Sequence, residues 1–173
     1  MKNIYIQTGE VKACANDTIL KSSPIGSCVV IAAYDTKEQV GAMAHFMLPG
    51  KAPDRKDYQK TRYVANALEE LISGMIVLGV KEKNIEVCLV GGANVMNRKD
   101  DIIASNNIAS VNEHLLKRNI RVRARSVGGT ERRSVSLDVK TGCVYYTVGD
   151  GAEKLLYKFV GNKRRKSDTR KKK

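Results

Sequence analysis

Short apolar runs along the chain predict strands, and two longer patterns of spaced apolar residues predict helices. Strands are expected over residues 29–34, 40–48, 85–90, 120–127, 134–139 and 143–148, because these segments are rich in apolar and β-branched residues and end at turn residues. The polar stretch 35–39 separates the first two strands and predicts a hairpin.

Apolar residues spaced three and four apart predict two main helices. The first is expected over 61–78, with the apolar positions Val64, Leu68, Leu71, Ile72, Met75 and Leu78, and it ends at Gly79. The second is expected over about 107–118, with Ile108, Val111, Leu115 and Leu116 facing inward. The order of strands and helices predicts an α+β domain with a mixed or antiparallel sheet rather than a parallel doubly wound fold.

The length and cysteine pattern narrow the class of protein. A chain of 173 residues fits one domain with a proper core. Runs of eighteen apolar residues are missing, and the first residues lack the apolar segment of a signal peptide, so we expect no membrane insertion. Four cysteines without short pair spacing indicate reduced thiols in a cytoplasmic protein, not a disulfide framework or a zinc site.

Positive charge is concentrated at the end of the chain. Of the net charge of +13, residues 163–173 carry +7, with eight basic residues and one acidic residue. Such a segment cannot bury apolar area, so we expect a disordered basic tail after a domain over 1–162. It could be a solvated tail or a tether for an acidic protein, nucleic acid or lipid surface. Nucleic-acid binding is disfavoured because only 5% of the residues are aromatic, too few for a base-stacking surface.

A cysteine nucleophile needs a base within hydrogen-bond reach, and the chain has only two histidines. If the hairpin turn is centred between Thr36 and Lys37, Cys28 lies directly opposite His45, where sulfur and imidazole could touch. We would then expect the imidazolium to lower the pKa of the Cys28 thiol. The other histidine, His114, is expected on a helix surface, far in sequence from any cysteine.

The segment before Cys28 is small, polar and expected to be a flexible loop, from Ser22 to Ser27. Free backbone N–H groups near Gly26 to Cys28 could stabilise an oxyanion there. The alternative is an ordinary loop with a buried free cysteine and a histidine satisfied in the core. The other three cysteines, Cys14, Cys88 and Cys143, are interpreted as small core residues, and 91–94 as a tight turn.

Several motifs together resemble a known family. They are Gly26-Ser27-Cys28-Val29, the stretch from Gly41 to Pro49 (GAMAHFMLP), Gly91-Gly92-Ala93, Gly128-Gly129, Arg133-Ser134-Val135 and Thr141-Gly142. In this order, and with 17 residues from Cys28 to His45, they resemble the chemoreceptor glutamine deamidase family, CheD. The resemblance covers about residues 3–158, nearly everything before the basic tail.

The resemblance implies a fold and a set of site residues. The expected fold is an α+β sandwich related to bacterial toxin deamidases, and the expected catalytic set is Cys-His-Thr. Cys28 and His45 match the first two positions, and Ser22 stands where the family has threonine. The chain also departs from the family at 104–107, where only Asn107 is kept from a Gly-x-Arg-Asn motif, and at Ser126, where an acidic residue is common.

The resemblance also implies the reaction and its partners. The expected activity is deamidation of glutamines in methyl-accepting chemotaxis receptors, through a thioester on Cys28 and without cofactor or metal. Some substrates could instead be methyl-glutamate esters. A CheC-type phosphatase is a further expected partner. The alternative is a non-catalytic chemotaxis regulator that binds the receptor or CheC through the same surface, which the changes at Ser22 and 104–107 favour and the retained Cys28 and His45 oppose.

Overall fold

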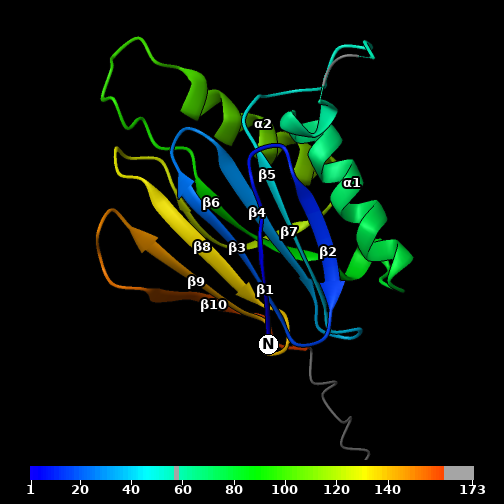
Figure 1. The fold of residues 1–173 in the computed structure, drawn as a ribbon. Helices are drawn as coiled ribbons and strands as arrows, with labels where there is room; N and C mark the ends of the chain where they lie inside the picture. The colour runs from blue at the N-terminus through cyan, green and yellow to red at the C-terminus, as the bar shows by residue number, and fades with distance from the viewer. Residues whose placement is uncertain (57–58, 162–173) are drawn as a thin grey trace, which may run out of the picture.

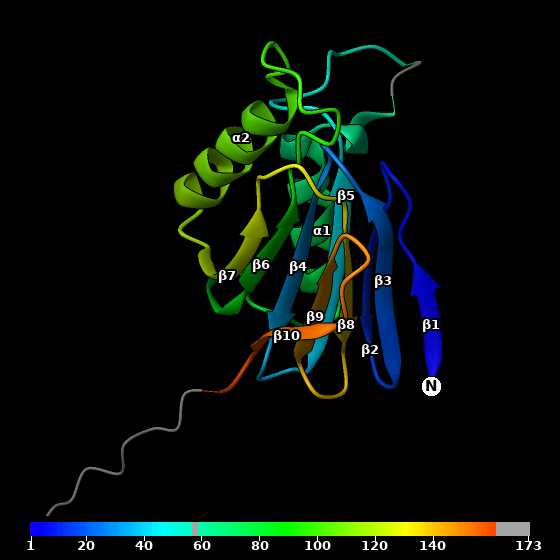
Figure 2. The ribbon, with the colours of Figure 1, turned by 90° about the vertical axis from the view of Figure 1, so that its left-hand side faces the viewer.

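Two five-stranded sheets pack face to face in the computed structural model, which describes residues 1–56 and 59–161 (Figures 1 and 2). One sheet has the order β1 (Lys2–Tyr5), β3 (Thr18–Ile25), β8 (Arg133–Asp138), β9 (Cys143–Val148) and β10 (Lys154–Lys158). The other has β2 (Val11–Ala15), β5 (Val40–Phe46), β4 (Val29–Asp35), β6 (Glu86–Gly91) and β7 (Arg121–Val127). The pairs β1–β3 and β6–β7 are parallel and the others antiparallel, so the expected α+β sandwich with mixed sheets is confirmed. The predicted basic tail, 163–173, lies outside the described residues.

Both main helices cover the outer face of the second sheet (Figure 2). They are α1 (Val64–Val77) and α2 (Ile103–Lys117), with short 3₁₀ turns η1 (Lys60–Arg62) and η2 (Glu82–Asn84). The apolar stripe predicted for α1 is buried. Two residues expected to face inward do not: Leu78, where α1 ends, is 41% exposed, and Leu116 is 81% exposed. Leu115 already fills the inward position, and the next residue is turned about 100° away from it.

The strands β4 and β5 separate two cores. Their side chains alternate, so one set packs against the helices and the other lies between the sheets. Ile31, Ala44 and Phe46 belong to the helix-side core, whereas Val30 and Met43 belong to the core between the sheets. Both strands are therefore buried on both faces, which explains why they appear in the sequence as nearly continuous apolar runs.

The register of the β4–β5 hairpin differs from the prediction. His45 pairs with Val30, two residues after the expected partner Cys28, and Asp35 pairs with Val40. The centre of the turn therefore lies one residue later than expected. The Asp35 carboxylate accepts the Lys37 N–H at 2.9 Å and starts a four-residue loop, which ends at Gln39 with a φ of +53°. Because the shift is an even number of residues, Cys28 and His45 still face the same side of the sheet.

The structure of residues 18–25 differs from the prediction, because they form strand β3. The segment Ser22–Ser27 was expected to be a loop, but Ser22 lies inside β3, opposite Val135 of β8. Its side chain is only 1% exposed because it takes the inward position of an alternating pattern that starts with Thr18 and Leu20. The short strands β1, β2 and β10 were not predicted either.

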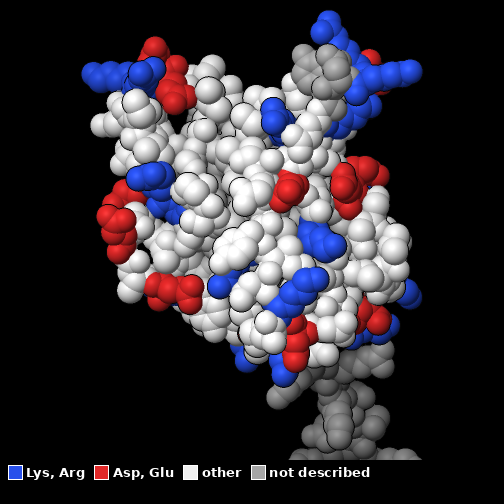
Figure 3. Space-filling model, in the orientation of Figure 1, with Lys and Arg blue, Asp and Glu red and all other residues white. Residues whose placement is uncertain are grey.

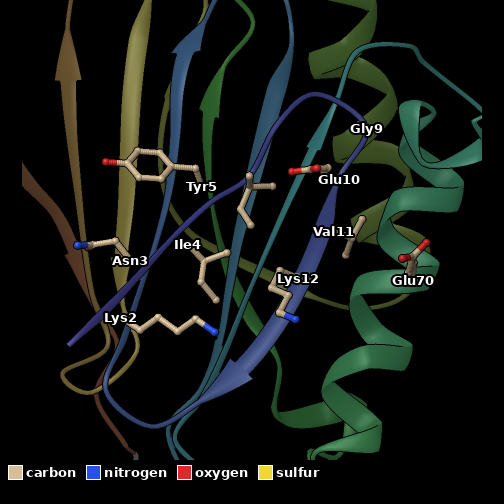
Figure 4. A pocket seen from close by; sticks show the side chains of 10 residues that line it. Lys2, Asn3, Ile4, Tyr5, Gly9, Glu10, Val11, Lys12 and Glu70 are labelled. Atoms are coloured by element: carbon tan, nitrogen blue, oxygen red, sulfur yellow. The ribbon is translucent and has the colours of Figure 1, made fainter.

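The sandwich is open on the side where β1 and β2 form the edges of their sheets. A groove of about 690 Å³ runs between these strands (Figure 4). Residues 2–6 and 9–12 line it together with Glu70 of α1, and Cys28, His45 and Ser22 lie outside this lining. The loop that joins the two strands passes from one sheet to the other over the upper end of the groove (Figure 4). Over the described part of the chain, neither helix has the length and apolar character needed to cross a bilayer.

Candidate active site

The predicted site residues come together at one end of the sandwich, where β3 and β5 end and β4 begins (Figure 1). Ser22 comes from the first sheet, His45 from the second, and Cys28 from the connection between β3 and β4. Two loops, over residues 47–56 and 92–102, project on either side of this end. Figure 3 shows a hollow between them.

The backbone before Cys28 is held by three hydrogen bonds from different parts of the fold. The Gly26 carbonyl accepts the Ala93 N–H at 2.9 Å, and the Cys28 carbonyl accepts the Gly92 N–H at 2.7 Å. Between them, the Ser27 carbonyl accepts the side-chain amide of Asn107 at 3.0 Å. Because C=O and N–H point in opposite directions across a trans peptide, the N–H groups of Ser27 and Cys28 are turned away from these anchors.

Gly91 allows the end of β6 to lie close to the backbone at Cys28. A Cβ at this position would lie 2.3 Å from the Cys28 carbonyl oxygen, and its φ of +121° is a conformation that residues with a Cβ rarely adopt. The end of β6 can therefore contact the backbone at Cys28 only because residue 91 is a glycine. The tight turn expected over 91–94 is thus part of the support for Cys28.

Asn107 of α2 links the segment before Cys28 to the segment after His45. Its amide nitrogen donates to the Ser27 carbonyl and to the Met47 carbonyl, each at 3.0 Å. The first lies just before Cys28, and the second lies two residues after His45. Asn107 is fully buried, and its side-chain oxygen has no hydrogen-bond partner among the described residues.

His45 is held in one orientation by Ser22. The Ser22 hydroxyl donates to the Ile6 carbonyl at 2.7 Å and lies 2.8 Å from His45 Nδ1. Since the single hydroxyl proton is used by the carbonyl, the serine oxygen must accept the proton of Nδ1–H. In neutral His45 the other ring nitrogen, Nε2, is therefore unprotonated and can act as a base.

Thr8, which sequence reasoning missed, lies between the two predicted catalytic side chains. Its hydroxyl oxygen is 3.4 Å from His45 Nε2, and it also hydrogen-bonds the Cys28 thiol. Within the described residues, Cys28 and His45 share no direct hydrogen bond. The signal for Thr8 is weak in the sequence, since an exposed threonine 20 residues before Cys28 resembles an ordinary turn residue.

Burial disfavours the charged forms of Cys28 and His45. It raises the pKa of the Cys28 thiol, and the hydrogen bond from Thr8 offsets only part of this rise. It also lowers the pKa of His45, against a smaller opposite effect of the Ile6 carbonyl. The expectation that an imidazolium lowers the thiol pKa is therefore wrong for this resting state, because both shifts favour thiol and imidazole over thiolate and imidazolium.

The remaining cysteines and histidine lie elsewhere. Cys88 and Cys143 are buried, Cys14 is partly buried against the core between the sheets, and none of the four cysteines forms a disulfide. Burial raises the pKa of Cys88 to about 12. His114 lies on α2, where its Nδ1 is 2.8 Å from the Ser110 carbonyl. The interpretation of these cysteines as core residues agrees with their positions.

Comparison with known proteins identifies the family. Residues 47–147 match the family model described as CheD chemotactic sensory transduction. A probable chemoreceptor glutamine deamidase CheD of Chlorobium luteolum is 40% identical over 91% of this chain and 78% of its own length. The chemoreceptor glutamine deamidase CheD of Thermotoga maritima is 31% identical over 92% of this chain and its full length. The chain belongs to the CheD family.

Three positions at which this chain was compared with the CheD family pattern, Ser22, Asn107 and Ser126, each make a side-chain hydrogen bond in the structure. Ser22, which stands where the family resemblance expects threonine, supplies the hydroxyl that contacts His45. Asn107, the one residue kept from the Gly-x-Arg-Asn motif, is the residue that anchors the segment before Cys28. At Ser126 the hydroxyl accepts a hydrogen bond from the Arg133 guanidinium at 3.0 Å. Each of these side chains makes a defined contact at or near the site end of the sandwich.

Proposed function

We propose that this chain deamidates glutamine side chains of methyl-accepting chemotaxis receptors in the cytoplasm, with Cys28 as nucleophile and His45 as base. The observation that carries the proposal is the hydrogen-bonded series from the Cys28 thiol through Thr8 and His45 to Ser22. It provides a nucleophile, an unprotonated ring nitrogen and a group that orients the ring, which together meet the requirements of acyl transfer. The names of the relatives supply the substrate class.

In the first half of the reaction, the proton of the Cys28 thiol passes to His45 Nε2 and sulfur attacks the amide carbon of the glutamine. The N–H groups of Ser27 and Cys28 stabilise the oxyanion, because their peptides are anchored from the opposite side by Ala93 and Asn107. The His45 imidazolium then gives its proton to the departing nitrogen. Ammonia leaves, and a thioester on Cys28 forms.

The second half hydrolyses the thioester. His45, neutral again, takes a proton from water, and the resulting hydroxide adds to the thioester carbon. The carbon–sulfur bond breaks, the thiolate recovers the proton from His45, and glutamate is released. The Ser22 contact fixes the ring in both halves, since Nδ1 remains the protonated nitrogen whenever Nε2 exchanges its proton.

The two loops beside the site suit a helical, acidic substrate. The loop over 47–63 carries five basic and two acidic residues. On the other loop and at the start of α2, four large apolar side chains are 40–67% exposed: Val95, Met96, Ile102 and Ile103. An amphipathic receptor helix can place its acidic face on the first loop and its apolar face on the second. A CheC-type phosphatase would compete with the receptor for the same loops.

The deciding experiment is mass spectrometry of a purified receptor cytoplasmic fragment incubated with the protein. We expect specific glutamines to gain the mass change from amide to acid with the parent protein and none with Cys28→Ala. Cys14→Ala is the matched control, because Cys14 is also partly buried and burial raises its thiol pKa too, but it has no histidine partner. Receptor binding without any conversion by the parent would instead favour the non-catalytic regulator.

A further inference from the structure

The position of Thr8 is fixed by the hydrogen bonds of the loop around it. Ile6 N–H donates to the Lys21 carbonyl of β3 at 2.7 Å, and Gly9 N–H donates to the His45 carbonyl of β5 at 2.7 Å. The loop is therefore bound to the first sheet through Ile6, two residues before Thr8, and to the second sheet through Gly9, one residue after it. These bonds hold the backbone of the loop tip beside the His45 ring.

Gly9 holds the loop from its outer side as well. Its carbonyl accepts hydrogen bonds from the Thr61 hydroxyl at 2.5 Å and from the Gln59 side chain at 3.3 Å. Its φ is +83°, and a Cβ there would lie 2.6 Å from the Gln59 side-chain nitrogen. These contacts connect the Thr8 loop to the basic loop beside the site, so the backbone next to Thr8 is held from two directions.

The hydrogen-bond directions around Thr8 follow from the chemistry of its neighbours. His45 Nε2 is an acceptor, because Nδ1 carries the ring proton. In the neutral pair the Thr8 hydroxyl can donate its proton to Nε2 while its oxygen accepts the proton of the Cys28 thiol. Once the thiolate has formed, the hydroxyl donates to the sulfur instead, and this contact is the one that lowers the thiol pKa. The 3.4 Å separation is long, as is common for catalytic hydrogen bonds before substrate binds.

We propose that Thr8 is a further catalytic residue that relays the proton from Cys28 to His45. This inference rests on the proposed function. In the relay the sulfur–hydrogen bond breaks as the thiol proton moves to the Thr8 oxygen, and the original hydroxyl proton moves to Nε2. The products are thiolate, imidazolium and an intact threonine hydroxyl, so atoms and charge balance without any further reactant. Afterwards the same hydroxyl can donate to the new thiolate.

The relay solves a problem that the neutral resting pair creates. Since burial favours thiol and imidazole, a standing thiolate is scarce and the proton has to move as the reaction starts. Among the described residues Cys28 and His45 share no direct hydrogen bond, and a group that both donates and accepts can bridge them. A hydroxyl has both capacities, whereas a methyl group has neither.

The test compares Thr8→Val, which keeps the shape but loses the hydroxyl, with Thr8→Ser, which keeps the hydroxyl. The measurement is the rate of iodoacetamide labelling of Cys28 as a function of pH, followed by peptide mass spectrometry, with Cys14 as the internal reference thiol. We expect Thr8→Val to slow labelling about tenfold near neutral pH and to remove the pH dependence due to His45, while Thr8→Ser stays within about twofold of the parent.

The outcomes separate the relay from the proposed function. If His45→Ala slows labelling but Thr8→Val does not, the relay is wrong and the Cys28–His45 pair stands. If neither variant changes labelling, both the relay and the pair are wrong. If Thr8→Ser is as slow as Thr8→Val, the role of Thr8 is packing and not proton transfer. Because Thr8 is exposed, melting curves of both variants should match the parent, and they serve as the folding control.

Discussion

His45 and Phe46 are neighbours in β5, yet they belong to two different environments. Phe46 points into the core between the second sheet and the helices, where it packs within a cluster of apolar side chains. His45 points between the two sheets, where the apolar layer of Val30 and Met43 ends and Ser22 and Thr8 supply hydrogen bonds. The first core contributes to stability through apolar packing. The second core has polar side chains in place of apolar ones at its end, where the candidate site lies.

The difference shows how the proposed catalytic pair, Cys28 and His45, is built into a small sandwich. The site lies at the end of the inter-sheet core, between two projecting loops, and its backbone is anchored from outside by Gly92, Ala93 and Asn107. The helix-side core supports those anchors, because α2 presents Asn107 from its buried face. Packing on one side of the sheet thereby positions the chemistry on the other.

The largest expected effects come from replacing Phe46 and His45 by alanine in two separate variants. Phe46→Ala should lower the free energy of unfolding by about 3–5 kcal/mol, because it leaves a cavity in the helix-side core. His45→Ala should remove deamidation down to the level of Cys28→Ala but change stability much less, since Ser22 keeps its hydrogen bond to the Ile6 carbonyl. Urea unfolding and receptor-fragment turnover measure the two effects. Substantial turnover by His45→Ala would contradict the assignment of the base.

Much of the fold could be predicted because β4, β5, β6 and α1 bury regular apolar patterns. Strands β1 and β2 could not, since they are short sheet edges with exposed polar residues such as Lys2 and Lys12, and they give no periodic signal. The pairing of Cys28 with His45 was predicted in the wrong register, but the face was right because the error was two residues.

The candidate site likewise contains residues that could be predicted from the sequence and residues that could not. Cys28 and His45 follow from residue type and spacing, and Ser22 follows from the family resemblance. Thr8 and the anchoring role of Asn107 depend on contacts between segments 37 and 80 residues apart, which local patterns do not encode. The directions of the pKa shifts of Cys28 and His45 also could not be predicted from the sequence, because they depend on burial in the folded protein. The sequence pattern alone favours a thiolate beside an imidazolium.

Asn107 tests whether the helix layer positions the chemistry. Asn107→Leu keeps the approximate size but leaves the Ser27 and Met47 carbonyls without their donor, at a cost of about 1–3 kcal/mol for each unpaired group. We expect lower stability and, in protein that is still folded, a lower turnover because the oxyanion-binding peptides shift. Asn106→Leu is the matched control, since Asn106 is exposed on the same helix. Unchanged turnover in folded Asn107→Leu would show that the anchor serves stability only.

Ser22 is expected to give the smallest effect, because the fold provides a substitute for its hydroxyl. In Ser22→Ala, Nδ1–H of His45 loses the serine oxygen but can still donate to the Ile6 carbonyl, which already interacts with the ring. We therefore expect a loss of about tenfold in single-turnover rate, milder than removal of the nucleophile. Ser22→Thr should keep the parent rate because the hydroxyl is retained, and Ser23→Ala, at the exposed neighbouring position, is the control.

The tautomer of His45 sharpens this last prediction. If Ser22 orients the ring as proposed, ¹⁵N NMR of the parent should show a protonated Nδ1 and an unprotonated Nε2 at neutral pH. Ser22→Ala should then retain this tautomer only in part, and its rate should fall in proportion to the fraction that keeps Nε2 free. Equal rates for the parent, Ser22→Ala and Ser22→Thr would remove Ser22 from the catalytic set and assign the orientation of the ring to the Ile6 carbonyl alone.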